Sequence, residues 1–412
     1  MNKEEFDVVI IGAGPSGAVA GAMLANLGRK VLIVEKEHFP RFSIGESLLP
    51  QCMSFLSDAG LENIVDKLAL DNGFQFKNGA AFTRGDQHSY FDFTQKFSPG
   101  RGTTYQVKRA SFDKLLADGA TEKGVEIRYG HTVIAVDIDS KSPVLDIKGE
   151  DGECYQAQGK FLLDASGFGR VLPRLLNLEM PSDFPVRQSF FTHFHDNISD
   201  DSFDRDKILI TVHPTESDIW YWLIPFSDGS ASVGVVGEPK QFDEKMMPEE
   251  VLLSFIDQAP NLKSLLQRAK PINEVRTIKG YSANVTKLHG KNFALLGNAG
   301  EFLDPVFSSG VTIALKSASL ISPLVEQYLN GDDIDLANDY AQPLKRGVDC
   351  FRTFVTSWYD GRFQDVVFYH TQDGQVRNMI SSILAGYAWD DENPYVAQSE
   401  RRLNVLAELC GS

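Results

Sequence analysis

The 412-residue sequence predicts a mixed α/β fold in which two domains are interwoven and a helical region follows. Three patterns lead to this prediction. A strand, a glycine-rich turn, a helix and a second strand succeed one another within residues 6–35, strand-like alternation recurs in residues 181–284, and amphipathic helical patterns begin at Leu320. The chain is also longer than one ordinary domain, so two connected domains are expected.

The composition argues against several classes of function. Hydrophobic residues make up 42% and charged residues 23%, which is typical of a folded globular protein. The net charge is −16 and the Lys and Arg residues form no run, so no nucleic-acid partner is expected. The four cysteines are far apart, and His193 and His195 have no acidic or cysteine partner at ligand spacing, so no metal site or disulfide framework is predicted.

The N-terminal apolar run is not expected to be a signal peptide. Acidic residues flank it in place of a basic cluster, and Pro15 and three spaced glycines interrupt it. We therefore expect no membrane span and, with reduced cysteines, a cytoplasmic location.

The first motif is FDVVIIGAGPSGAVAGAMLANLGRKVLIVEKE, which predicts a Rossmann-like βαβ unit. Gly12 allows a sharp turn, Gly14 leaves room for a pyrophosphate, and Gly17 lets the helix pack closely against the strand. Glu35 ends the second strand, where a carboxylate accepts hydrogen bonds from ribose hydroxyls. The alternative is a glycine turn needed only for packing. The predicted elements are a strand at 6–11, a helix ending near Gly28 and a strand at 31–35.

Three further segments resemble the FAD-dependent monooxygenases of the p-hydroxybenzoate hydroxylase fold. YQVKRASFDKLLADGA is similar to their R-x-x-F-D-x-x-L element, beginning at Arg109, and FLLDASGFGR is similar to their D-A-S-G strand end at Asp164. NFALLGNAGEFLDPVFSSGVTIALKSA resembles their strand, loop and helix beside the flavin. Asn298 stands where the family usually has aspartate, so it brings no charge to that contact.

This resemblance implies FAD as the cofactor and a division of the chain into three parts. The FAD-binding domain is expected at residues 1–75, 100–180 and 285–330, the substrate-side sheet at 76–99 and 181–284, and the helical region at 331–412. The expected cofactor-binding residues are Gly12, Gly14, Ser16, Gly17, Glu35, Lys36, Arg41, Glu46, Ser47, Arg109, Asp164, Asn298, Pro305 and Gly310.

Within that fold, the sequence looks most like the flavin-dependent halogenases that act on phenols and pyrroles. PRFSIGESLLP resembles their G-E-S-x-x-P loop, and GFQFKNGAAF resembles the segment that holds their catalytic lysine, here Lys77. DPVFSSGV resembles the loop that binds halide through backbone N–H groups, here those of Ser309 and Gly310. Phe307 stands where the tryptophan-type enzymes have a glutamate, which argues against free tryptophan as the substrate.

Lys77 is the residue on which the predicted chemistry depends. In the family, a lysine between flavin and substrate receives hypohalous acid and delivers the halogen to one ring carbon. Such a lysine belongs in a dry tunnel, where desolvation lowers the pKa of its amine. Small and aromatic residues surround Lys77 in the sequence. The alternative is an ordinary strand lysine with its amine in water.

DIWYWLIPFSDG resembles the family's W-x-W-x-I-P element, although Ile219 stands where a glycine often precedes it. Residues two apart on a strand face the same way, so Trp220 and Trp222 are predicted to form one wall. The resemblance implies that this wall shields the substrate from the flavin; the alternative is simple packing of a sheet. The following Asp228-Gly229 pair predicts a hairpin turn.

The remaining segments predict structure more than chemistry. THFHDNISDD (residues 192–201) is interpreted as a polar loop, and LISPLVEQYLNG as an amphipathic helix that ends near Gly331. The aromatic segment SWYDGRFQDVVFYH (residues 357–370) either closes a substrate pocket or buries a helix.

Three functions are compatible with these motifs. The first is a halogenase that uses reduced FAD, O2 and halide on an electron-rich aromatic ring, with a separate flavin reductase and a carrier protein as expected partners. The second is an FAD-dependent reductase or hydroxylase of the same fold, similar to the geranylgeranyl reductases, acting on a lipid-like or aromatic substrate. The third is a flavin-binding accessory protein without catalysis. Halide dependence and the need for Lys77 distinguish the first from the others.

Overall fold

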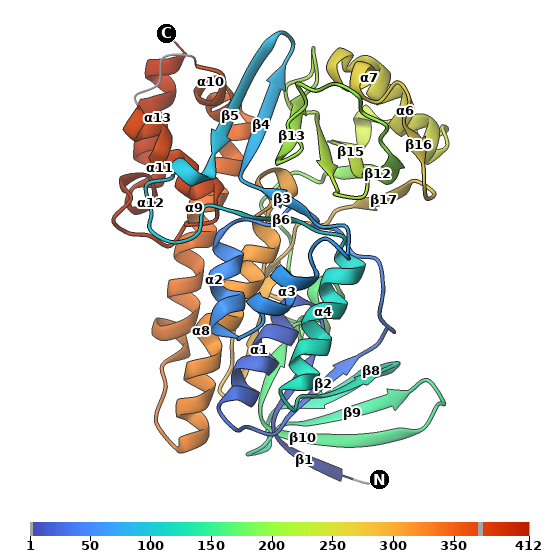
Figure 1. The fold of residues 1–412 in the computed structure, drawn as a ribbon. Coiled ribbons are helices and arrows are strands. Elements are labelled where there is room, and N and C mark those ends of the chain that lie inside the picture. Colours follow the sequence, from blue (N-terminus) through green and yellow to red (C-terminus); the bar gives the residue numbers. More distant parts are fainter. Residues whose placement is uncertain (1–2, 370–373, 412) are drawn as a thin grey trace.

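The computed structural model describes residues 3–369 and 374–411. Two sheets lie at opposite ends of the molecule in Figure 1, joined by a middle layer, and the C-terminal helices pack beside the second sheet. This is the mixed α/β arrangement that the sequence predicts. No helix among the described residues is long and apolar enough to cross a membrane.

The first sheet has the strand order β7-β2-β1-β10-β9-β8, and β19 pairs with β10. Its core is the predicted βαβ unit, in which β1 pairs in parallel with β2 and with β10. Helices α1, α4 and α8 cover one face (Figure 1). The bounds are β1 Lys3–Ile11, α1 Pro15–Asn26, β2 Val31–Glu35, α4 Arg109–Glu122, β7 Glu126–Tyr129, β8 His131–Asp137, β9 Val144–Gly149, β10 Cys154–Asp164, α5 Val171–Leu175, β19 Phe293–Leu295 and α8 Ser309–Asn330.

The second sheet has the order β16-β12-β15-β14-β13-β4-β5, and β17 pairs with β12. The predicted hairpin is confirmed, because β14 and β15 pair antiparallel around Gly229, whose φ is +78°. The bounds are β4 Gly79–Arg84, β5 Gln87–Asp92, β12 Gln188–His195, β13 Lys207–Val212, β14 Trp220–Pro225, β15 Ser230–Gly237, β16 Lys270–Pro271 and β17 Arg276–Lys279.

Two features of residues 181–284 differ from the prediction. The supposed polar loop THFHDNISDD is wrong in its first part, because Thr192 to His195 end strand β12, where Phe194 is buried and the backbone pairs with β15. Helices α6 (Pro248–Gln258) and α7 (Pro260–Leu265) cover the outer face of the sheet, although only strands were predicted there.

The middle layer and the C-terminal helices complete the fold. Strand β3 (Gln75–Lys77) pairs with β6 (Thr104–Gln106) between the two sheets. Helix α8 ends as predicted, with Gly331 at a φ of +94°. The other elements are α2 Gln51–Asp58, α3 Glu62–Leu68, β11 Glu179–Met180, β18 Asn284–Val285, α9 Gln342–Tyr359, α10 Arg362–Phe368, α11 Gly374–Leu384, α12 Pro394–Ala397 and α13 Ser399–Cys410.

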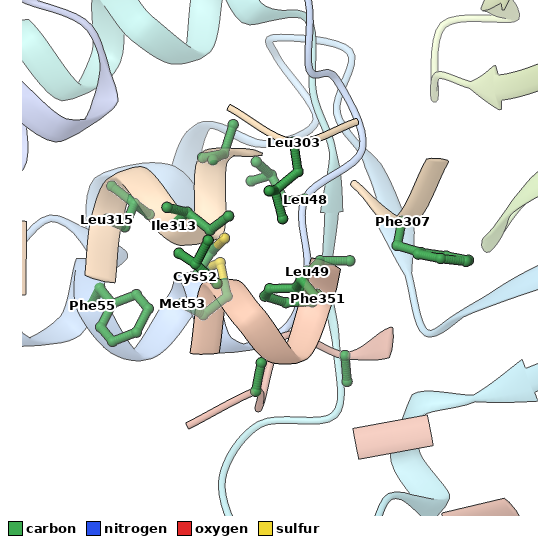
Figure 2. Close-up of a cluster of buried hydrophobic side chains, with 14 of the residues drawn as sticks. Leu48, Leu49, Cys52, Met53, Phe55, Leu303, Phe307, Ile313, Leu315 and Phe351 are labelled. Atoms are coloured by element: carbon green, nitrogen blue, oxygen red, sulfur yellow. The ribbon is translucent and has the colours of Figure 1, made fainter. Parts of the chain in front are cut away.

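One hydrophobic core holds together the segments that surround the site. Figure 2 shows Cys52 and Met53 of α2 packed beside Ile313 and Leu315 of α8, with Leu48 next to them. The G-E-S loop immediately before this segment and the start of α8 are therefore anchored in the same core. This core holds the G-E-S loop and the loop that leads into α8 at a fixed distance from each other, although they are far apart in the sequence.

Candidate functional site

A cavity of about 350 Å³ lies where the carboxyl ends of β1 and β2 face strand β14 of the second sheet. In α/β proteins, ligands bind at this edge of a parallel sheet. Most of the residues predicted to bind the cofactor line this cavity, namely Gly12, Gly14, Ser16, Glu35, Lys36, Arg41, Glu46, Ser47, Arg109, Asn298, Pro305 and Gly310.

The glycine turn forms one end of the cavity. Gly12 has a φ of +97°, and a Cβ there would lie 2.6 Å from the Ala165 carbonyl oxygen, so only glycine fits. At Gly14 the nearest atom to an added Cβ is an Arg41 nitrogen at 3.7 Å, so the backbone borders open space. Glu35 is held beside the turn because its carboxylate accepts hydrogen bonds from the Ala13 N–H at 2.8 Å and the Glu37 N–H at 3.0 Å.

Two arginines line the cavity next to this turn, and one buried carboxylate orients both. Asp113 accepts from Arg109 Nε at 2.7 Å and Nη2 at 3.0 Å, and from Arg41 Nη1 at 3.3 Å. Arg109 also donates to the Ile44 carbonyl oxygen. The R-x-x-F-D element thus positions cationic groups where a pyrophosphate would lie.

Two of the predicted cofactor-binding residues do not line the cavity. Gly17 faces the turn instead, since a Cβ there would lie 2.0 Å from the Gly12 carbonyl oxygen. Asp164 is fully buried at the end of β10, where it accepts from the Ser166 N–H at 2.9 Å and the Leu172 N–H at 2.6 Å. Burial raises the pKa of its carboxyl group. Both residues shape the backbone that borders the cavity.

The loop from Asp304 to Gly310 forms the other end. Pro305, Ser308 and Gly310 line the cavity, and Ser308 adopts a left-handed conformation with φ +56° just before α8 begins at Ser309. The first N–H groups of a helix have no partner within the helix, so they attract anions. Ser309 is itself buried and does not line the cavity through its side chain.

Trp220 and Trp222 form one wall of the cavity, as the strand alternation predicts, with ring centroids 5.9 Å apart. Tyr221 and Leu223 point into the other core, beneath α6 and α7. Ile219 is buried in that same core, so this chain accommodates a large side chain where the family often has glycine.

Lys77 is fully buried, which excludes the alternative of an ordinary strand lysine with its amine in water. Its Nζ donates to Ser47 Oγ and to the Leu48 carbonyl oxygen, each at 2.8 Å, and lies 5.5 Å from the Phe93 ring centroid. Burial lowers the pKa of the amine from 10.5 to about 7. Lys77 does not line the cavity directly, but its partner Ser47 does.

Two contacts at the site were missed in the sequence because they join distant segments. His193 Nε2 lies 2.8 Å from Glu46 Oε1, although no acidic partner is near it in the sequence. Tyr359 accepts a hydrogen bond from the indole of Trp220 at 2.9 Å. The aromatic segment around Tyr359 also buries Trp358 against Phe307, with ring centroids 5.6 Å apart.

The lining residues fit FAD. The turn end offers backbone N–H groups, the Glu35 carboxylate and two arginines, which suit a ribose and a pyrophosphate. The far end is bounded by Trp220, Trp222 and Ile224, which suit a flat ring system. Glu46 Oε2 is buried there without a hydrogen-bond partner in the described part of the chain, so it is available to a donor on the ligand.

Comparisons with known proteins agree with this reading of the cavity. The family model described as an FAD binding domain matches residues 5–332. A 1H-pyrrole-2-carbonyl-(peptidyl-carrier protein) brominase of Pseudoalteromonas luteoviolacea is 30% identical over 80% of this chain and 79% of its own.

Solved structures extend the similarity to nearly the whole chain. A flavoprotein/dehydrogenase of Cytophaga hutchinsonii has a TM-score of 0.94 at 42% identity and covers 99% of both chains. A flavin-dependent brominase has a TM-score of 0.85 at 27% identity and covers 98% of this chain and 99% of its own. The protein therefore belongs to the FAD-binding-domain family and, within it, to the flavin-dependent halogenases, and it is an FAD-dependent oxidoreductase.

Proposed function

We propose that this halogenase uses Lys77 to transfer an oxidised halogen to an electron-rich aromatic ring. The observation that carries the proposal is the environment of the Lys77 amine, which is fully buried, has a pKa lowered to about 7 and lies one side chain away from the cavity. A lysine with that pKa is half unprotonated at neutral pH. Its free amine can accept halogen from hypohalous acid with release of water.

The residues that line the cavity support a binding site for the cofactor and one for the halide. Reduced FAD, when bound, would supply the electrons that convert O2 and halide into hypohalous acid and water. Glu35, Arg41 and Arg109 would hold its ribose and pyrophosphate, and Asn298 its ribityl chain. The backbone N–H groups of Ser309 and Gly310 would hold the halide, because they lie at the start of a 22-residue helix, where N–H groups attract anions. The loop itself carries no cationic side chain, so these N–H groups would bind the halide without one.

One residue of the same region supports a substrate class. Phe307 is buried against Trp358 and Phe363, so the loop carries no carboxylate where the tryptophan-type enzymes have a glutamate. This supports a pyrrole or phenol over free tryptophan. The brominase relative is named for a pyrrole carried on a peptidyl carrier protein, which supports a tethered substrate here, and a separate flavin reductase would supply the reduced FAD.

The experiment needs no substrate. The protein is loaded with reduced FAD and mixed with O2, with and without bromide or chloride. Flavin and peroxide are then removed, and the oxidising equivalents retained by the protein are titrated. Retention that depends on halide and disappears in Lys77→Ala supports the proposal. A wild-type protein that binds FAD and retains none under either condition contradicts it.

A second candidate is a reductase or hydroxylase of the same fold that does not use halide. The observation that favours it is the similarity, at 42% identity, to a protein described as a flavoprotein/dehydrogenase. This candidate predicts that halide changes neither the rate of flavin reoxidation nor the products, and that Lys77→Ala retains turnover.

A further inference from the structure

The two tryptophans of the cavity wall are held in different ways. Trp222 donates its indole N–H to Ser232 Oγ at 3.1 Å, a residue on the neighbouring strand of the same sheet. Trp220 donates its indole N–H to Tyr359 Oη at 2.9 Å, and Tyr359 is the last residue of α9. The position of Trp220 therefore depends on a helix outside its own sheet.

Tyr359 also contacts the 304–310 loop, which lines the same end of the cavity as Trp220. Its hydroxyl group donates to Asp304 Oδ2 at 3.0 Å, while Asp304 Oδ1 accepts from the Val306 N–H at 3.0 Å. Asp304 thereby holds the turn Pro305–Phe307, which leads directly to Ser308 and α8. Tyr281 adds only a long contact of 3.5 Å to the same carboxylate.

The tyrosine ring is fixed from the other side. The guanidinium group of Arg187 lies 3.9 Å from the ring centroid, and Arg187 is itself held by the Asp218 carboxylate at 3.1 Å, just before β14. Trp220 and Asp304 are 1% and 2% exposed. A buried carboxylate is unfavourable unless it is hydrogen-bonded, so simple packing gives no reason for Asp304.

We propose that Tyr359 is a positioning residue that couples the Trp220 wall to the 304–310 loop and so fixes the position of the loop relative to the wall at the end of the cavity where the halide is oxidised. This inference rests on the proposed function, since the loop is there assigned to halide binding. A loop that is held loosely aligns its N–H groups less well with the halide. As a result, less of the oxidant formed from reduced FAD and O2 would oxidise halide, and more would be released as free hydrogen peroxide.

The test compares Tyr359→Phe with Tyr221→Phe. Both variants lose one hydrogen-bonded tyrosine hydroxyl group, since Tyr221 Oη donates to the Phe255 carbonyl oxygen at 3.0 Å. Tyr221 lies on the same strand as Trp220 but faces away from the cavity. In Tyr359→Phe, the bromide concentration for half-maximal retention of oxidising equivalents should rise about five- to ten-fold, as the loss of the hydrogen bond that holds Asp304 in the loop implies. The ratio of free peroxide to retained equivalents should rise with it. Tyr221→Phe should change neither.

A second readout does not depend on halogenation. In the full-length protein without FAD, acrylamide should quench tryptophan emission more strongly in Tyr359→Phe than in the wild type, because Trp220 loses its partner. Tyr221→Phe should resemble the wild type. Absence of retained equivalents in the wild type contradicts the proposed function but leaves this comparison intact. Unchanged quenching together with unchanged bromide dependence in Tyr359→Phe overturns the positioning role.

Discussion

Replacing Lys77 by methionine should stabilise the protein while it abolishes halogen transfer. Burial lowers the pKa of the amine from 10.5 to about 7. A tenfold change in proton affinity corresponds to ~1.4 kcal/mol, so the protonated lysine opposes folding by ~5 kcal/mol below pH 7. Methionine has a similar volume and no charge. The substitution removes the hydrogen bonds from Lys77 to Ser47 Oγ and to the Leu48 carbonyl oxygen, and each loss costs ~1 kcal/mol of unfolding free energy.

The expected balance is a gain of ~2 kcal/mol in the unfolding free energy at pH 7. The wild type has a further signature. Between pH 7 and 10.5 its unfolded state binds the proton that the folded state has lost, so its stability rises with pH, by ~2 kcal/mol from pH 7 to 9. Lys77→Met lacks this rise.

The assay is urea unfolding of the FAD-free protein at pH 7 and pH 9. Lys207→Met is a matched control, because Lys207 is also mostly buried but donates to Asp204 and Asn78, so its removal breaks an ion pair and should destabilise the protein. Two results together would refute the argument that the amine is desolvated. They are a Lys77→Met variant less stable than the wild type at pH 7 and a wild type equally stable at pH 7 and pH 9. Retained halide-dependent oxidising equivalents in Lys77→Met would refute its chemical role.

Three further predictions follow from the same contacts. If the free amine of Lys77 accepts the halogen, retention of oxidising equivalents should rise about ten-fold between pH 6 and 8, because the pKa is about 7; a fall over this range, in rapid-mixing experiments, would assign the role to the protonated lysine. Burial raises the pKa of Asp304 to about 6. Between pH 4 and 6 the folded protein therefore binds more protons than the unfolded protein, so its stability falls by up to ~3 kcal/mol as the pH rises through that range. Asp304→Asn should remove this fall in urea titrations at pH 4.5 and 7, and a variant that keeps it would show that another group is responsible. Gly14→Val should weaken FAD binding more than ten-fold in a fluorescence titration while it leaves the thermal midpoint nearly unchanged, since its side chain projects into open cavity; undiminished FAD binding would place the pyrophosphate elsewhere.

The elements that the sequence predicts correctly depend on short-range rules. The βαβ unit at residues 6–35, the hairpin turn at Gly229 and the helix end at Gly331 each follow from a few neighbouring residues, among them glycines at positions that require a positive φ. The shared face of Trp220 and Trp222 follows in the same way from the two-residue period of a strand. Helix α6 also carried a local signal that was overlooked, because Glu250 accepts a hydrogen bond from the Met247 N–H three residues earlier.

Tertiary structure alone decided the chemistry of these residues. Desolvation sets the pKa of Lys77, and it depends on side chains contributed by distant segments, among them Ser47 and Phe93. The pairing of His193 with Glu46 and the contact of Tyr359 with Trp220 each bridge more than a hundred residues, so no local pattern encodes them. The sequence by itself determined the βαβ unit, the hairpin and the end of α8, and the motifs that these elements carry. The packing of two sheets and a helical region around one cavity decided which side chains are dry, paired and close enough to act together.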